Sequence, residues 1–165
     1  MTFTLRQIAD AYSDNWGDGQ TEEERQRVYD RTRMLRDKGL ICSTNPRSQG
    51  KAMTFTEADT AFAVVALAAS LNGVSWGTIE LLNLQLRKVK SALGKPMFER
   101  NLGSIKSGLP IFARIDHIQA PYPQNPASMG GPEIQAAEPA EGTTQILIWP
   151  VTQLAKPVLD SLGDE

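Results

Sequence analysis

A dense run of arginine and lysine in the first third of the chain is the feature best suited to chemistry. Within residues 25–51, eight basic residues stand against two acidic ones, in a chain whose overall net charge is −2. The basic residues are Arg25, Arg27, Arg31, Arg33, Arg36, Lys38, Arg47 and Lys51. Guanidinium and ammonium groups at this density bind phosphate groups, and an arginine also binds the edge of guanine through two parallel hydrogen bonds. By charge alone, a solvated helix face that serves only solubility is an equal alternative.

The sequence contains few residues that could form a disulfide, a metal site or a catalytic site. The single cysteine, Cys42, excludes an internal disulfide framework, and together with the single histidine, His117, it cannot build a conventional Cys/His zinc cage. No serine or cysteine is placed to make His117 part of a catalytic triad, and no cluster of acids, bases or metal ligands recurs at functional spacing. We therefore expect no enzymatic activity, no catalytic residue, no metal and no cofactor.

The chain also gives no membrane or export signal. No apolar run approaches the roughly 20 residues that span a bilayer, and the first residues lack a charged-then-apolar leader. We expect a soluble protein of the cytoplasm.

Local signals indicate two helices and a hairpin around the basic run. A short helix is expected from Thr4, and turn residues follow at 13–20. Thr21 and Glu24 match a capping box that begins a second helix, which we expect to end at Lys38, before Gly39. Most of the cylinder of this second helix is polar and basic.

Short apolar segments at 40–42 and 52–55 are expected to be the two strands of a hairpin. The loop between them, residues 43–51, holds Arg47 and Lys51 at or near its tip. The hairpin would therefore carry positive charge next to the second helix.

Two further helices are expected after the hairpin. The helix that Thr56 begins is apolar on most sides, which is typical of a central core element. A helix from Ser75 repeats apolar residues at heptad spacing over only two heptads, which favours a core stripe over a coiled coil. These residues are Ile79, Leu82, Leu86, Val89 and Leu93.

The remaining third differs in composition. Strands are expected at 109–118 and 145–149, and Thr152 is expected to cap a closing helix. Residues 119–142 contain five prolines, three glycines and no lysine or arginine, which predicts a flexible loop. We expect three parts: a helical domain with the hairpin at 1–94, a linker at 95–108, and a β-hairpin-plus-helix unit at 109–165. The expected fold class is therefore α+β.

Four segments resemble the DNA-binding domain of the MerR-type regulators. Residues 3–9 (FTLRQIA) are similar to the opening helix of that family, and residues 32–41 (TRMLRDKGLI) resemble the end of its recognition helix. Residues 53–59 (MTFTEAD) are similar to the strand-to-helix step after its wing, and residues 72–82 (NGVSWGTIELL) resemble the turn into its last helix. The resemblance covers about residues 3–93 and implies a winged helix-turn-helix whose second helix enters the major groove while the wing contacts the backbone.

The chain departs from the family at several places. Met34 and Leu35 stand where the family has paired tyrosines, whereas Arg33 matches the family's arginine. No long dimerisation helix follows Leu93, and the cysteine cluster of the metal-sensing members is absent. Metal sensing is therefore not expected.

These observations predict a sequence-specific, DNA-binding transcriptional regulator. The candidate DNA-binding residues are Arg25, Tyr29, Arg31, Arg33, Arg36, Arg47 and Lys51. We expect the C-terminal unit to form a homodimer on double-stranded DNA, because the exposed edge of a short apolar strand can pair with a second copy. The candidate dimer residues are Ile146, Ile148, Val158 and Leu159.

Two other functions remain open. An excisionase-like recombination accessory protein would use the same winged fold to bend DNA. A protein-interaction adaptor would keep the fold without binding DNA. RNA polymerase or another regulator is a further candidate partner of the predicted regulator.

Overall fold

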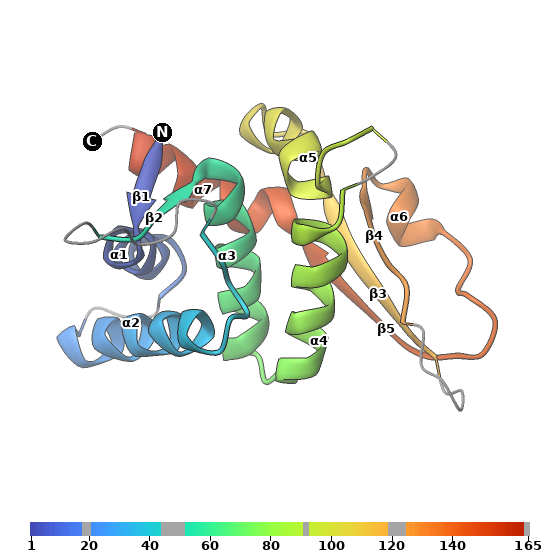
Figure 1. The fold of residues 1–165 in the computed structure, drawn as a ribbon, viewed down its shortest axis with the longest axis horizontal. Helices are drawn as coiled ribbons and strands as arrows, with labels where there is room; N and C mark the ends of the chain where they lie inside the picture. Colours follow the sequence, from blue (N-terminus) through green and yellow to red (C-terminus); the bar gives the residue numbers. More distant parts are fainter. Residues whose placement is uncertain (18–20, 44–51, 91–92, 119–124, 164–165) are drawn as a thin grey trace.

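The computed structural model describes residues 1–17, 21–43, 52–90, 93–118 and 125–163. The fold is α+β, with a two-stranded sheet at one end, a three-stranded sheet at the other, and helices between them (Figure 1). The helices are α1 Leu5–Trp16, α2 Glu22–Asp37, α3 Glu57–Leu71, α4 Trp76–Leu82, the π-helix η1 Asn83–Lys88, α5 Met97–Lys106, α6 Glu133–Ala136 and α7 Val151–Gly163. The strands are β1 Thr2–Thr4, β2 Thr54–Thr56, β3 Phe112–Ile118, β4 Ala127–Gly130 and β5 Thr143–Pro150. None of the described helices is both long enough and apolar enough to cross a membrane.

Two copies of the tripeptide Thr-Phe-Thr organise the N-terminal half. Strands β1 and β2 pair antiparallel, and the buried side chains of Phe3 and Phe55 lie opposite each other. The last threonine of each strand then caps the next helix, because Thr4 accepts a hydrogen bond from the backbone of Gln7 and Thr56 accepts one from Asp59. Because the strands are antiparallel, helices α1 and α3 start from opposite ends of this small sheet.

The expected hairpin between 40–42 and 52–55 does not form its predicted strand pair. Leu40 and Ile41 are buried but are not in a strand, because both of their N–H groups point back to the Leu35 carbonyl at the end of α2, at 2.9 and 3.4 Å. Strand β2 pairs with β1 instead. The two ends of the segment still meet, since the Ser43 hydroxyl donates to the Thr54 carbonyl. Residues 44–51 lie outside the described residues.

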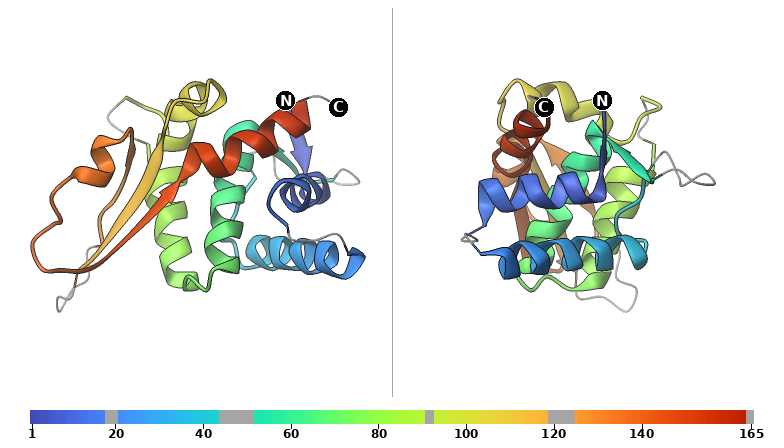
Figure 2. Two further views of the ribbon diagram at one scale, coloured as in Figure 1. Left: turned by 180° about the vertical axis from the view of Figure 1, so that it is seen from behind. Right: turned by 90° about the vertical axis from the view of Figure 1, so that its left-hand side faces the viewer.

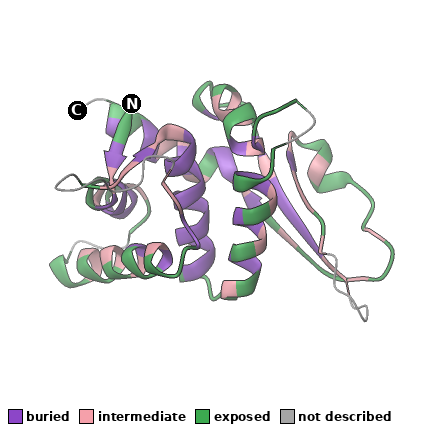
Figure 3. Ribbon diagram, viewed as in Figure 1, coloured by how far each residue is buried: buried purple, intermediate pink, exposed green. Residues whose placement is uncertain are grey.

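Helix α3 is the central element, as its sequence predicts. Every side chain from Ala58 to Ser70 is buried, and α2, α5 and α7 pack around the helix (Figures 2 and 3). The small side chains of Ala63, Ala66 and Ala69, all at most 1% exposed, let these neighbours approach closely.

Helix α7 joins the C-terminal part of the chain to the same core. It packs against α3 and α1, where the Trp16 indole N–H donates to the Leu154 carbonyl at 2.9 Å. Val158 and Leu159 belong to the hydrophobic core that also contains Phe3. The side chains of Val158 and Leu159 are thus buried within a single chain, so their assignment to a dimer surface is wrong. The core is continuous across the predicted boundary between 1–94 and 109–165.

The heptad expected at residues 75–93 is interrupted by the π-helix η1. Ile79, Leu82 and Leu86 are buried as predicted, whereas Val89 and Leu93 are 50% and 73% exposed. A π-turn contains more residues than an α-turn, so the spacing that aligned the stripe is lost after η1 begins.

The three-stranded sheet has the order β4-β3-β5, and both of its neighbouring strand pairs are antiparallel. Strands β3 and β5 confirm the two strands expected from the sequence. The segment 119–142 was expected to be a structureless loop, but its described part contains β4 and α6. The expected linker 95–108 likewise contains α5, whose Phe98 and Ile105 are buried in the core.

A buried ion pair anchors the 125–142 segment to the sheet. Arg114 contacts both carboxylate oxygens of Asp116, at 2.5 and 2.9 Å, and donates to the carbonyls of Ile134 and Ala137 at 3.0 and 2.6 Å. Asp116 also accepts a hydrogen bond from the backbone of Ala140 at 3.0 Å. The hydrogen bonds from Arg114 hold the pKa of Asp116 below its ordinary value.

The packing around α3 predicts a large cost for added volume. Replacing Ala66 by leucine should lower the free energy of unfolding by at least about 1–3 kcal/mol, because no space surrounds this buried methyl group. The matched control is A136L in the exposed helix α6, which should change stability by less than about 0.5 kcal/mol. Urea denaturation of the three proteins measures both effects, and equal midpoints for A66L and A136L would contradict the central position of α3.

The Arg114–Asp116 pair predicts an acid-sensitive component of stability. Because the pKa of Asp116 is lower in the folded chain, its contribution is complete above the unfolded value of about 3.9 and is lost as the pH falls through the folded value. D116N should lose about 3–5 kcal/mol at neutral pH, because it leaves buried Arg114 without its carboxylate. The difference in stability between wild type and D116N should therefore shrink below about pH 4. A difference that is constant from neutral to acid pH in urea titrations would rule out this component.

Candidate nucleic-acid interface

Helix α2 presents its basic residues in two separate stripes. Successive residues of an α-helix turn by about 100°, so residues spaced by three or four share a side. The first basic stripe consists of Arg25, Tyr29, Arg33 and Arg36, and the second consists of Arg27, Arg31 and Lys38 just past the helix end. The buried side chains of Thr32 and Leu35 lie between the stripes on the inner side. The capping box at Thr21 and the positive φ of 69° at Gly39 confirm the expected start and end of this helix.

The first basic stripe continues onto α1 through Arg6. The Arg6 guanidinium lies 4.9 Å from the centroid of the Tyr29 ring, a cation–π geometry. Arg6, Tyr29, Arg36 and Met53 line one surface pocket of about 430 Å³. The stripe therefore borders the strand β2 that follows the 44–51 segment.

Ion pairs occupy part of this stripe but leave it available. Arg25 pairs with Asp14, and Arg36 pairs with Asp37 at 2.5 Å, yet the two aspartates are more than half exposed. Exposed pairs of this kind contribute about 0–1 kcal/mol, so an incoming phosphate can replace the carboxylate. Arg33 is exposed and forms no ion pair with any described residue.

The second basic stripe is directed toward α4. Arg31 and Lys38 lie 5.6 and 5.5 Å from the centroid of the Trp76 ring, and Arg27 pairs with Glu23 at 2.7 Å. Arg31 thus lies on the side of the helix opposite to Arg36. The structure separates Arg31 from the other α2 residues with which the sequence grouped it.

Acidic residues follow the outermost line of α2, between the two basic stripes. This acidic stripe consists of Glu23, Asp30 and Asp37, with the uncharged Gln26 among them, and all four residues are exposed. The Gln26 amide donates to the Asp30 carboxylate at 3.1 Å. Carboxylates repel phosphates, so the basic flanks of this helix suit a phosphate better than its crest.

Strand β5 offers a second candidate surface. It is an edge of the three-stranded sheet, with β3 as its partner among the described strands. Ile146 and Ile148 point to the same face of the sheet and are each 38% exposed. The strand contains no charged residue that would discourage pairing with another strand.

The sequence identified most of the first basic stripe but missed Arg6 and Trp76. Arg6 is a lone cation in a separate helix, and Trp76 begins another helix, α4. Arg6 and Trp76 reach the side chains of α2 only because α1 and α4 pack beside that helix. Arg47 and Lys51 remain candidates from the sequence, outside the described residues.

Other chemistry is sparse in the part of the chain that the structure describes. No group of three or more His, Cys, Asp or Glu side chains there could hold a metal ion. His117 lies near the end of β3, where its Nδ1 is 3.2 Å from the Asn125 side-chain amide. Scanning the chain against protein-family models gives no match, and searching curated proteins gives none either.

Proposed function

We propose that this chain is a winged helix-turn-helix regulator that binds double-stranded DNA. The observation that carries the proposal is the first basic stripe, which continues from α2 onto Arg6 beside the segment that begins at Ser43 and returns at Thr54. A helix of this kind fits the major groove, and a neighbouring basic loop can contact an adjacent phosphate. The resemblance to MerR-type domains supports the same arrangement.

The division of α2 into stripes assigns different roles to its arginines. Arg33 lies closest to the crest, is exposed and has no described ion-pair partner, so it is the best candidate for a base edge. Arg25, Arg36 and Arg6 lie on the flank, where their exposed partners can give way to phosphates. Arg31 is the least suited of the predicted residues to this groove because it faces Trp76.

The protein would act as a homodimer. One small module makes few DNA contacts, whereas two modules on a two-fold axis read half-sites about 34–36 Å apart or a multiple of that distance. Antiparallel pairing of β5 with β5 of a second copy would satisfy the free edge and cover Ile146 and Ile148. RNA polymerase or another regulator is a further candidate partner.

A second candidate function is favoured by the acidic stripe. A protein-interaction adaptor could use Glu23, Asp30 and Asp37 on the crest of α2 to contact a basic partner. Such an adaptor would show no salt-sensitive binding to DNA, which separates the two functions directly.

We expect the arginines of the first stripe to contribute differently to DNA binding. Selection from a random duplex library with the wild-type protein defines the preferred site, and gel shifts then measure each variant on that site and on unrelated duplex. R33Q should lose about 1–3 kcal/mol of preference for the selected site. R36Q should weaken binding to both duplexes and reduce the slope of log K against log salt concentration by about 0.9.

The control for these variants is K156Q, which removes a positive charge from α7 at its pair with Asp160. It should bind like wild type on both duplexes. If R33Q and R36Q also behave like wild type, the first stripe is not the DNA-binding surface, and a library that yields no preferred site would contradict sequence-specific binding.

The β5 edge predicts the oligomeric state. The double variant I146K/I148K should be monomeric, because two lysines on this strand oppose pairing with a second copy. Light scattering after gel filtration measures the mass, and circular dichroism verifies the fold. A136K, which adds charge on exposed α6, should remain dimeric. A wild-type protein that is monomeric at every concentration tested would disprove the dimer.

A further inference from the structure

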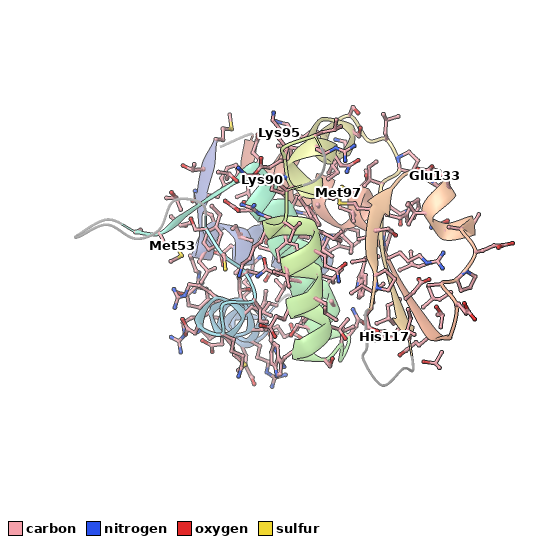
Figure 4. All side chains as sticks on the ribbon, turned by 45° about the vertical axis from the view of Figure 1, so that its right-hand side comes forward. Met53, Lys90, Lys95, Met97, His117 and Glu133 are labelled. Atoms are coloured by element: carbon pink, nitrogen blue, oxygen red, sulfur yellow. The ribbon has the colours of Figure 1, made fainter. Side chains whose placement is uncertain are left out.

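A second cationic site lies apart from the basic stripes of α2. A pocket of about 440 Å³ opens between the end of η1, the start of α5 and the segment that follows α2. Its described lining includes Cys42, Arg87, Lys88, Lys90, Pro96 and Glu99. Three cations thus stand against one carboxylate. Figure 4 labels Lys90, just after η1, and Met97, the first residue of α5, on the two elements that border this pocket.

Arg87 is a buried cation whose hydrogen bonds are incomplete. Its side chain is 7% exposed, and it pairs with fully buried Asp59 and lies 3.6 Å from Glu99. Its Nε finds no hydrogen-bond partner within the described structure. Burial lowers the pKa of the Arg87 guanidinium, whereas the charge of Glu99 acts in the opposite direction. An anion that enters the pocket beside Lys88 and Lys90 would also be attracted to that guanidinium.

The start of α5 adds backbone donors to the same pocket. Pro96 is the N-cap and makes no side-chain cap hydrogen bond, and Glu99 is the acidic residue in the first turn of this ten-residue helix. The N-terminus of a helix has unsatisfied N–H groups and the positive end of the helix dipole, both of which favour an anion. Lys88 and Lys90 are exposed at the rim, so their ammonium groups can reach a ligand that enters.

The π-helix explains how these groups come together. A regular α-helix through 83–88 would keep the heptad spacing and would place the following residues differently. The wider turn of η1 keeps Arg87 buried while Lys88 and Lys90 remain at the surface. π-helical turns are rare and are found frequently at functional sites.

We propose that this pocket binds a phosphate group. Tetrahedral oxyanions match the donors that border the pocket, which are a guanidinium, two ammonium groups and the N-terminus of α5. The phosphate could belong to a small phosphorylated ligand or to the backbone of bound DNA, because both present the same chemistry. The site does not require that the first basic stripe binds DNA.

Cys42 provides a specific reporter of occupancy. It is the single cysteine of the chain, it is partly exposed, and it lines the pocket. A bound phosphate should shield its thiol from the neutral reagent iodoacetamide. For a Kd of about 1 mM, about 10 mM inorganic phosphate should slow alkylation about tenfold relative to chloride at equal ionic strength.

The test measures this alkylation rate with inorganic phosphate and, separately, with a DNA duplex. K88Q/K90Q should abolish the protection, E99Q should tighten phosphate binding about threefold by removing a like charge, and K156Q should match wild type. Phosphorus NMR line broadening of inorganic phosphate gives a second readout that does not depend on the reactivity of the thiol.

Each outcome is decisive. Protection by inorganic phosphate that is lost in K88Q/K90Q supports the site and identifies a free ligand as sufficient. Protection by the duplex alone, lost in the same variant, supports the site with DNA as the source of the phosphate. Absence of protection and of line broadening overturns the proposal, even if gel shifts show that the protein binds DNA. If inorganic phosphate protects Cys42 from alkylation but gel shifts detect no DNA binding, the proposed function is wrong and the phosphate site is still supported.

Discussion

The arrangement of the whole molecule depends on the burial of α3 on every side. A helix without a solvent-facing stripe needs neighbours around its full circumference, and α2, α5 and α7 supply them. Alanine at many of its positions permits close approach and makes the spacing intolerant of larger side chains. The position of α2, which carries the first basic stripe, follows directly from this packing.

Asp59 links that central helix to the end of strand β2 and to the pocket that Arg87 lines. One carboxylate oxygen completes the capping box with Thr56, at the strand that pairs with β1, and the other pairs with Arg87 in η1. The single side chain of Asp59 therefore fixes where α3 begins and also holds Arg87 in the buried part of the pocket. Removing this buried carboxylate would leave Arg87 without its partner and would destabilise both the start of α3 and η1.

The charge pattern contains pairs of very different burial. Arg114 and Asp116 form a buried pair that holds the C-terminal sheet together, whereas Arg25 and Arg36 of α2 pair with exposed aspartates and so contribute little to stability. Exposed and weakly paired cations are the ones that can exchange a carboxylate for a phosphate. The acidic stripe on the crest of α2 would repel phosphates there, so the proposed exchange would occur on the flanks of the helix.

The elements themselves were largely predictable because their signals are local. Thr21 with Glu24, Thr56 and Gly39 mark helix ends through hydrogen bonds and backbone angles that involve only neighbouring residues. Most of the first basic stripe could likewise be found from the sequence. The two Thr-Phe-Thr strands were a further signal, but nothing in either tripeptide states that it pairs with the other.

Contacts between distant residues could not be read in this way. The Leu35 carbonyl captures the N–H groups of Leu40 and Ile41, the π-helix ends the heptad, and α7 buries Val158 and Leu159 in a shared core. The same is true of Arg31 against Trp76 and Arg6 against Tyr29. Each depends on competition among segments for the same buried space and the same hydrogen-bond partners, and that competition is resolved only when the whole chain packs.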